Sequence, residues 1–371
     1  MATKSNVFKR EQIFKDFLVP DYYKDFSCKG GECRDSCCVD WKVNISMQQY
    51  FLLHGLNCNK KLKDKIDRTF RPLINPSKDR YAEIVHTQDG DCPLHKADGY
   101  CLLHEKCGEE VLPWVCRYYP RGPRIDYLYE ASCANSCERT LELLFSSSEP
   151  VSFSSFKTNF LMSKPQNLPS EAEKDNYKLD RENIFRLMSN RSLSLRERLI
   201  NLGEYLALPK DSSFPKKDDL EIVLNTLSGI FNTFEGKFPR VYELIEKANK
   251  VYQNSKVSVY KEKLRIFEST FPNQEVLFEK MLVNEIYFRQ FPYQKNMVKT
   301  DQFIAIIGIY LLLRFIGIAL IEENDNLDNL IDIFSKFFTV VSHSDFDKQI
   351  VSYLKANKIA TLDIIAKYIA F

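Results

Sequence analysis

The stretch from Phe303 to Ile321 reads FIAIIGIYLLLRFIGIALI and is almost continuously apolar. At about 20 residues it is long enough to cross a bilayer as a helix. Arg314 lies inside it, and an unpaired charge there would cost several kcal/mol in lipid; no second apolar stretch of this kind follows. We therefore predict no membrane span but a helix at the centre of an α-helical domain, with Arg314 near its boundary or in a salt bridge.

A second helical pattern lies in residues 192–208, SLSLRERLINLGEYLAL. Its leucines recur at the spacing of one helix face: Leu195, Leu199, Leu202 and Leu206. Ser192 or Ser194 is a suitable N-cap, and Pro209 is a suitable stop. These patterns predict that residues 185–371 are mostly α-helical.

The segment before this helical region has a different composition. Residues 146–155 read SSSEPVSFSS and residues 164–174 read KPQNLPSEAEK, both rich in Ser, Pro and charge, which is typical of a connection. We predict a cysteine-rich metal domain over residues 1–145, a linker over 146–184 and an α-helical domain over 185–371. The predicted fold class is mainly α, with a loop-rich, cysteine-rich N-terminal metal-binding domain followed by an α-helical domain.

Length and charge exclude several classes of protein. The 371 residues suffice for two or three folded units, and the formal net charge of +2 indicates neither nucleic acid nor an anionic membrane as a partner. Only 12 glycines occur, and none form a G-x-G pair. The sequence therefore gives no indication of the phosphate-binding loops of Rossmann or P-loop proteins.

All 11 cysteines lie between Cys28 and Cys137. The first residues, MATKSNVFKREQIFKDF, contain no apolar core of the kind that a secretory signal requires. We therefore expect a cytoplasmic protein with reduced thiols. Clustered reduced thiols favour metal binding over disulfides or unrelated buried thiols.

The cysteines form groups along the chain. The first is Cys28-x4-Cys33-x3-Cys37-Cys38, the second is Cys92-x8-Cys101-x5-Cys107-x8-Cys116, and the third is Cys133-x3-Cys137. Gly30 and Gly31 permit the tight turning that brings closely spaced thiols to one centre. Cys58 stands alone and is predicted to be a core or incidental thiol.

Ligand spacing separates the possible metals. No C-x2-C pair and no C-x3-C-x2-C run of radical S-adenosylmethionine enzymes occurs. Four thiolates from separate loops would suit a [4Fe–4S] cluster. Zinc is the alternative, because Cys92 and His95, and Cys101 and His104, repeat a C-x2-H spacing. The excess of thiols over imidazoles favours the [4Fe–4S] cluster.

Several segments resemble the bacterial flagellin lysine N-methylase family, within a wider group that shares a cysteine-rich iron- or zinc-chelating domain. The segments are FLVPDYYKDFSCKGGECRDSCCVDWKVNIS (17–46), DCPLHKADGYCLLHEKCGEEVLPWVCRYYPR (91–121), YEASCANSCERTLELLF (129–145), RLMSNRSLSLRERLINLGEYL (186–206) and NEIYFRQFPY (284–293).

The resemblance implies which residues bind metal. The family pattern falls on eight cysteines: Cys28, Cys33, Cys37, Cys38, Cys92, Cys101, Cys116 and Cys137. Beside them it covers Trp41, Arg117, Tyr119, Pro120 and Arg121. It leaves out Cys58, Cys107 and Cys133, and it departs at His95, where the family usually has an apolar or small residue.

The resemblance also implies an activity: transfer of a methyl group from S-adenosylmethionine to lysine side chains of flagellin, with an iron–sulfur cluster bound by some of the eight cysteines. It does not identify the catalytic or donor-binding residues. Candidate proton acceptors near the cysteines are Tyr118, Tyr119, Tyr127, Tyr129, Asp91 and Glu130. The alternatives are a non-catalytic iron–sulfur or zinc module acting in assembly or redox sensing, and a two-electron redox enzyme.

Overall fold

The computed structural model describes residues 10–39, 42–165, 167–210, 220–231, 239–252 and 256–371. Within these ranges the chain is mainly helical, as predicted. The N-terminal helices are α1 (Met47–His54), α2 (Lys60–Thr69), α3 (Leu102–Cys107), α4 (Trp114–Tyr118) and α5 (Glu138–Phe145). The others are α6 (Glu171–Met188), α7 (Leu195–Tyr205), α8 (Leu220–Phe231), α9 (Pro239–Tyr252), α10 (Lys256–Thr270), α11 (Gln274–Phe288), α12 (Lys299–Leu320), α13 (Leu327–His343), α14 (Phe346–Ala356) and α15 (Leu362–Tyr368).

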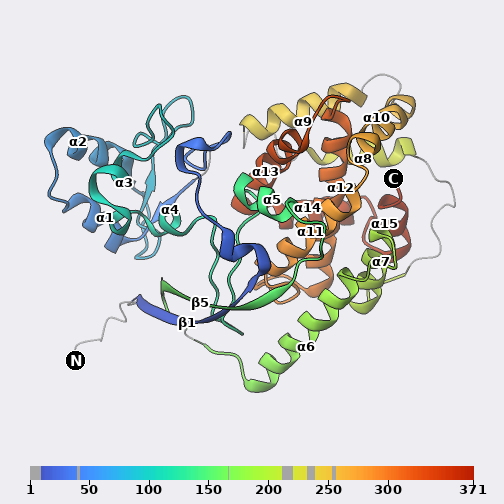
Figure 1. Cartoon of the computed structure of the whole chain (residues 1–371), viewed down its shortest axis with the longest axis horizontal. Coiled ribbons are helices and arrows are strands. Elements are labelled where there is room, and N and C mark those ends of the chain that lie inside the picture. Colours follow the sequence, from blue (N-terminus) through green and yellow to red (C-terminus); the bar gives the residue numbers. More distant parts are fainter. Residues whose placement is uncertain (1–9, 40–41, 166, 211–219, 232–238, 253–255) are drawn as a thin grey trace.

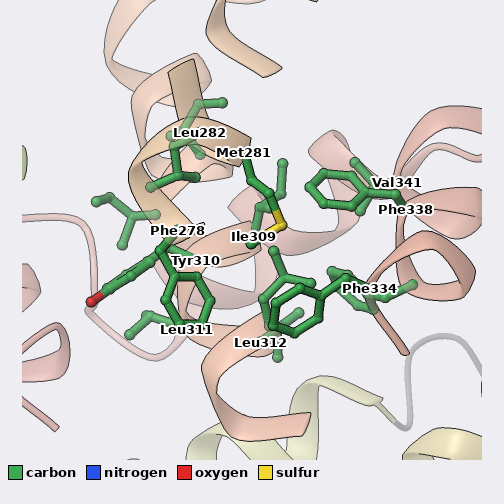
Figure 2. Close-up of a cluster of buried hydrophobic side chains, with 14 of the residues drawn as sticks. Phe278, Met281, Leu282, Ile309, Tyr310, Leu311, Leu312, Phe334, Phe338 and Val341 are labelled. Carbon is green, nitrogen blue, oxygen red and sulfur yellow. The ribbon is translucent and has the colours of Figure 1, made fainter. Parts of the chain in front are cut away.

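The apolar stretch from Phe303 to Ile321 forms most of α12, the central helix. It contacts α8, α9, α10, α11, α13 and α14. Figure 2 shows part of this packing, in which α11 and α13 place their apolar side chains against α12; the labelled residues include Met281, Ile309, Leu312, Phe334 and Phe338. Although α12 is long and apolar enough to cross a membrane, 94% of its most apolar window is buried inside the protein. It is packed as the core helix of a folded domain.

Arg314 lies inside this core and not near its boundary. The residue is 7% exposed. Its guanidinium donates to Gln274 Oε1 at 3.0 Å and to the backbone oxygen of Phe371 at 2.9 Å. The rings of Phe278 and Tyr310 also flank it, with centroids 5.9 and 5.8 Å away. Hydrogen bonds and ring contacts therefore hold this arginine, where we had expected a boundary position or a salt bridge.

The leucine stripe of residues 192–208 forms α7, and its N-cap is Ser194. The Ser194 hydroxyl accepts from the backbone N–H of Glu197, whose carboxylate in turn accepts from the Ser194 backbone. This reciprocal capping box satisfies two N–H groups that a helix start otherwise leaves unpaired. Leu195, Leu199 and Leu202 are buried, so the predicted apolar face is confirmed.

Residues 146–184, expected to be a linker, include a strand and most of a helix. Strand β5 (Phe153–Met162) pairs antiparallel with β1 (Glu11–Pro20) over ten residue pairs, and α6 begins at Glu171. Apolar side chains explain the difference, because Phe17 and Phe160 pack edge to face at 5.1 Å between ring centroids and both are buried. The Ser- and Pro-rich composition of this segment did not indicate that it contains β5, the strand that pairs with β1.

The described residues form two hydrophobic cores. The smaller core lies within residues 43–112 and includes a three-stranded antiparallel sheet of β2 (Asn44–Ile45), β4 (Ala82–Ile84) and β3 (Phe70–Pro72). We call residues 27–119 the cysteine lobe. The larger core combines β1, β5 and the helices from α5 onward, and we call it the helical body. Figure 1 shows the lobe, with α1 to α4, to one side of the body.

Candidate metal centre and adjoining cavity

Most of the predicted metal ligands meet at one cavity. Its volume is about 160 Å³, and seven of the eight cysteines line it: Cys28, Cys33, Cys37, Cys38, Cys92, Cys101 and Cys116. The eighth, Cys137, lies close enough to Cys33 and Cys37 to raise the pKa of both thiols. The sequence-predicted residues therefore come together from two segments of the chain, residues 28–38 and 92–116.

Backbone hydrogen bonds place three of these cysteines. The N–H of Cys92 donates to the carbonyl oxygen of Cys38 at 2.9 Å. A short antiparallel bridge joins His95 to Cys101, and Cys101 is the N-cap residue of α3. Because these contacts are made by the main chain, the thiols are held near one another whatever their side chains bind.

Glycines allow the first cysteine loop to approach this region closely. Gly30 adopts a φ of +61°, in the left-handed region that favours glycine. A Cβ on Gly31 would lie 2.2 Å from the carbonyl oxygen of Asp98 and 2.6 Å from the Tyr100 ring. These glycines therefore permit the expected tight turn, and their lack of a side chain also allows close packing against residues 98–100.

The surroundings shift the pKa values of the thiols in opposite directions. Burial raises the pKa of Cys92 to about 12 and that of Cys116 well above its usual value. A hydrogen bond with the Cys37 thiol lowers the pKa of Cys38 to about 6, and His95 contributes in the same direction. Cys38 is thus the thiol that most readily supplies the thiolate that metals bind.

No single-ion site is preformed in the part of the chain that the structure describes, because no three His, Cys, Asp or Glu side chains there converge closely enough to hold one ion. The imidazoles of the zinc alternative, His95 and His104, line the same cavity as the thiols. His95 Nδ1 lies 3.3 Å from Asp91 Oδ1, and its Nε2 lies 3.3 Å from Ser36 Oγ. Metal binding by this lobe remains a prediction.

The three cysteines outside the family pattern lie elsewhere. Cys58 and Cys107 pack against the small core, and each is close enough to the other for Cys58 to raise the pKa of Cys107. Cys133 is fully buried in the large core. No disulfide joins any of the eleven cysteines. Trp41, which the family pattern also covers, lies outside the described residues.

A second cavity lies where the cysteine lobe meets the helical body. It has a volume of about 550 Å³, and we call it the interlobe cavity. Its lining comes from α4, the end of β5, and the C-terminal ends of α11 and α13: Arg10, Trp114, Val115, Tyr118, Tyr119, Pro120, Arg121, Pro123, Ala134, Leu161, Met162, Ser163, Phe288, Ser342 and His343. Tyr119 also lines the thiol cavity, so this one side chain separates the two spaces.

The interlobe cavity is aromatic and cationic. The Arg10 guanidinium lies over the Trp114 ring, 3.4 Å from its centroid. Burial lowers the pKa of His343 to about 4, so this imidazole is uncharged at neutral pH. No Asp or Glu occurs among the described residues that line the cavity. The positive electrostatic field of the cavity therefore favours ligands that carry a carboxylate. Its cationic and aromatic side chains also favour ligands that carry an aromatic ring.

The six candidate proton acceptors separate into distinct positions. Tyr118 and Tyr119 line the interlobe cavity; the Tyr118 hydroxyl accepts from the Leu161 N–H at 2.8 Å, and the Tyr119 hydroxyl donates to Ser136 Oγ at 3.1 Å. Asp91 lies beside His95. The other three lie away from both cavities.

Tyr127, Tyr129 and Glu130 make packing contacts and hydrogen bonds typical of residues with a structural role. Tyr127 stacks on Tyr177 with ring centroids 4.6 Å apart, and Tyr129 packs against Phe17. Glu130 is buried and accepts hydrogen bonds from Tyr177 and Arg181. Tyr127, Tyr129 and Glu130 line neither the thiol cavity nor the interlobe cavity.

Among the lining residues of the interlobe cavity that were not singled out in the sequence are Arg10, Trp114 and His343. His343 is distant in sequence from every cysteine, and only the packing of α13 against the lobe brings it to Tyr119, with ring centroids 6.2 Å apart. The one available signal was that His343 is the single histidine beyond the cysteine-rich region.

Comparison with known proteins finds a family model that matches part of the chain. Residues 204–367, from the end of α7 into α15, match the model described as the FliB lysine N-methylase C-terminal domain. This part of the chain is therefore similar to the C-terminal domain of FliB lysine N-methylases. This confirms the resemblance noted in the sequence, although the matched domain contains none of the cysteines.

Two relatives are similar over a shorter stretch. Lysine-N-methylase of Salmonella typhimurium is 26% identical over 106 residues, which are 28% of this chain and 25% of that protein. Flagellar biosynthetic protein FliU of Salmonella muenchen is 26% identical over 106 residues, which are 60% of that protein. The aligned part thus spans less than two thirds of either relative. No solved structure matches the chain.

Proposed function

We propose that this protein is a cytoplasmic protein-lysine N-methyltransferase that transfers a methyl group from S-adenosylmethionine to lysine side chains of flagellin. The observation that carries the proposal is the match of residues 204–367 to the lysine N-methylase domain. The flagellar name of the FliU relative supports a flagellar target. Eleven cysteines without a disulfide are consistent with a reducing compartment.

We further propose that a [4Fe–4S] cluster occupies the thiol cavity on Cys38, Cys92, Cys101 and Cys116. The donor set fits, because each of these thiols lines one enclosed space and the pKa of Cys116 is raised by the other three. Four thiolates from separate loops are the ligands that such clusters use. When bound, the cluster would supply cross-links between loops and thus folding free energy.

The interlobe cavity is the proposed reaction site. Methyl transfer needs a neutral lysine held about 3–3.5 Å from the methyl group, whereas a free lysine has a pKa of about 10.4. Arg10 and Arg121, with no carboxylate among the described lining residues, disfavour a protonated amine and lower its pKa. The same guanidiniums would pair with the carboxylate of S-adenosylmethionine, and Trp114 would stack on its adenine ring.

Calorimetry with S-adenosylmethionine tests this proposal. We expect the full-length protein to bind S-adenosylmethionine and to methylate lysines of co-expressed flagellin, as located by peptide mass spectrometry. Trp114→Ala should weaken binding by about 1–3 kcal/mol, or roughly 5- to 150-fold, because a ring that stacks on a base contributes about this much. The control variant is Leu168→Ala, which shortens a side chain that is 65% exposed.

Two results would contradict the proposal. Wild-type protein that neither binds S-adenosylmethionine nor methylates flagellin would instead favour a non-catalytic metal module. Binding that Trp114→Ala leaves unchanged would move the donor site away from the interlobe cavity.

A further inference from the structure

The cysteine lobe carries an exposed surface that is both apolar and basic. Phe51 in α1 and Ile74 in the loop between β3 and β4 are 57% and 98% exposed, and Met47, Lys78 and Arg80 beside them are exposed too. We call the surface formed by these five side chains the docking face. Given the proposed function, on which this step rests, we propose that the docking face binds the protein that is methylated, through a segment that carries carboxylates beside apolar side chains.

Main-chain hydrogen bonds join the two parts of the docking face. The N–H of Met47, the first residue of α1, donates to the carbonyl oxygen of Lys78 at 2.8 Å. The N–H of Leu73 donates to the carbonyl oxygen of Tyr81 at 3.0 Å, which closes the two ends of the loop on one another. The loop and the helix are therefore fixed relative to each other before a partner binds, and such preorganisation lowers the entropic cost of binding.

Aromatic rings pack at the base of the docking face. The ring centroid of Tyr81 lies 5.8 Å from that of Phe51 and 5.1 Å from that of Tyr50. Tyr50 also packs against His54, with ring centroids 4.1 Å apart. Tyr50 and Tyr81 are half-buried, whereas Phe51 is exposed, so the packed rings hold Phe51 at the surface. Phe, Tyr and Met are among the residues enriched in protein interfaces.

The charge of this part of the lobe indicates which partner it suits. Residues 42–84 contain nine Lys or Arg and four Asp or Glu, a net charge of +5, whereas the whole chain carries +2. Opposite charge around an apolar centre favours encounter with the right partner and disfavours others. The docking face is therefore complementary to an acidic protein segment.

A protein segment suits the docking face better than a membrane surface. Helices that lie on membranes bury a long apolar face in the lipid, whereas α1 has eight residues and buries Gln49 and Leu53 within the lobe. Its exposed apolar side chains, Met47, Phe51 and Leu52, span less than two turns. A few anchoring side chains of this kind are what a protein interface requires.

The docking face adjoins the proposed reaction site. Burial lowers the pKa of Arg10, and Tyr118 and Asp79 are close enough to oppose this lowering. Asp79 lies between Lys78 and Arg80 in the loop of the docking face, and Arg10 and Tyr118 line the interlobe cavity. A protein bound on the docking face would thus present nearby lysines to the cavity.

Biolayer interferometry of the full-length protein on immobilised monomeric flagellin, without S-adenosylmethionine, tests the inference. Phe51→Ala combined with Ile74→Ala should raise the dissociation constant about tenfold, because anchoring side chains are lost. Lys78→Glu combined with Arg80→Glu should weaken binding and remove most of its salt dependence. Both double variants should fold, since these side chains are exposed. The control is Ile222→Ala, which shortens a 53% exposed side chain of α8 and should bind like the wild type.

Methylation kinetics separate docking from catalysis. Both double variants should raise KM for flagellin and leave kcat unchanged, while a short peptide around the modified lysine should be methylated at the wild-type rate. Flagellin binding that both variants leave unchanged would overturn the docking face. Loss of peptide methylation would also overturn it, because the effect would then lie in the reaction site.

Two further outcomes distinguish the docking face from its alternatives. Binding to phosphatidylserine vesicles that the charge-reversal variant abolishes, with flagellin binding unchanged, would assign the surface to a membrane and overturn the inference. Absence of methylation by the wild type, with flagellin binding that both variants weaken, would contradict the proposed function and support the docking face.

Discussion

Replacing Cys116 by serine is expected to remove the proposed metal centre, the solubility of the purified protein and lysine methylation together. Cys116 lines the thiol cavity, and the thiols that add to its raised pKa are Cys38, Cys92 and Cys101. In small metal-organised domains the metal contributes about 10–16 kcal/mol of folding free energy. Loss of one ligand should therefore unfold much of the cysteine lobe.

The measurement is iron and sulfide content, soluble yield and methylated flagellin for wild type and variant. Cys58→Ser is the matched control, because Cys58 packs against the same small core but lines neither cavity. It should keep metal and activity. Cys116→Ser protein with its full iron content would show that Cys116 is not a ligand.

Replacing Glu279 by alanine is expected to lower the free energy of unfolding by about 3–5 kcal/mol, because it leaves a buried arginine without its counter-charge. Glu279 is 1% exposed. Arg191 binds it through Nε at 2.9 Å and Nη2 at 2.8 Å, and Arg198 Nη1 lies 2.6 Å from Oε2. Arg198 is itself 2% exposed, so water cannot replace the lost carboxylate.

Urea denaturation followed by circular dichroism measures the change. Glu279→Gln keeps an oxygen acceptor and should recover part of the loss. Glu243→Ala removes a solvent-exposed i,i+4 ion pair with Lys247 and should leave the midpoint unchanged. A loss of under about 1 kcal/mol for Glu279→Ala, the size typical of surface pairs, would mean that Arg198 finds another partner.

The helical body was predictable because its signals are local. An apolar run centred on α12 and a capped leucine stripe in α7 each specify a helix without reference to any other segment. The β1–β5 pair was missed because each strand needs a partner about 140 residues away. A local signal did exist, since Ile13, Phe17 and Val19 are buried at alternating positions.

The candidate metal site was predictable for a different reason. Thiols are scarce and chemically distinctive, so their clustering between Cys28 and Cys137 indicates convergence even without known contacts. Sequence spacing could not show which thiols lie together, because the main-chain hydrogen bond between Cys92 and Cys38 joins segments that are distant in sequence. The interlobe cavity was not predictable at all: Arg10, Trp114 and His343 meet there only through tertiary packing.

The central claim is a polar, two-electron methyl transfer in which the proposed metal centre holds the lobe together. The sequence lacks the cysteine spacing of radical S-adenosylmethionine enzymes, so no external electron should be needed. The direct test is to incubate the protein with flagellin and S-adenosylmethionine, with and without reductant, and to quantify the products. We predict S-adenosylhomocysteine in proportion to methylated lysine, without reductant. Accumulation of 5′-deoxyadenosine in proportion to methylated lysine, and only with reductant, would contradict the account.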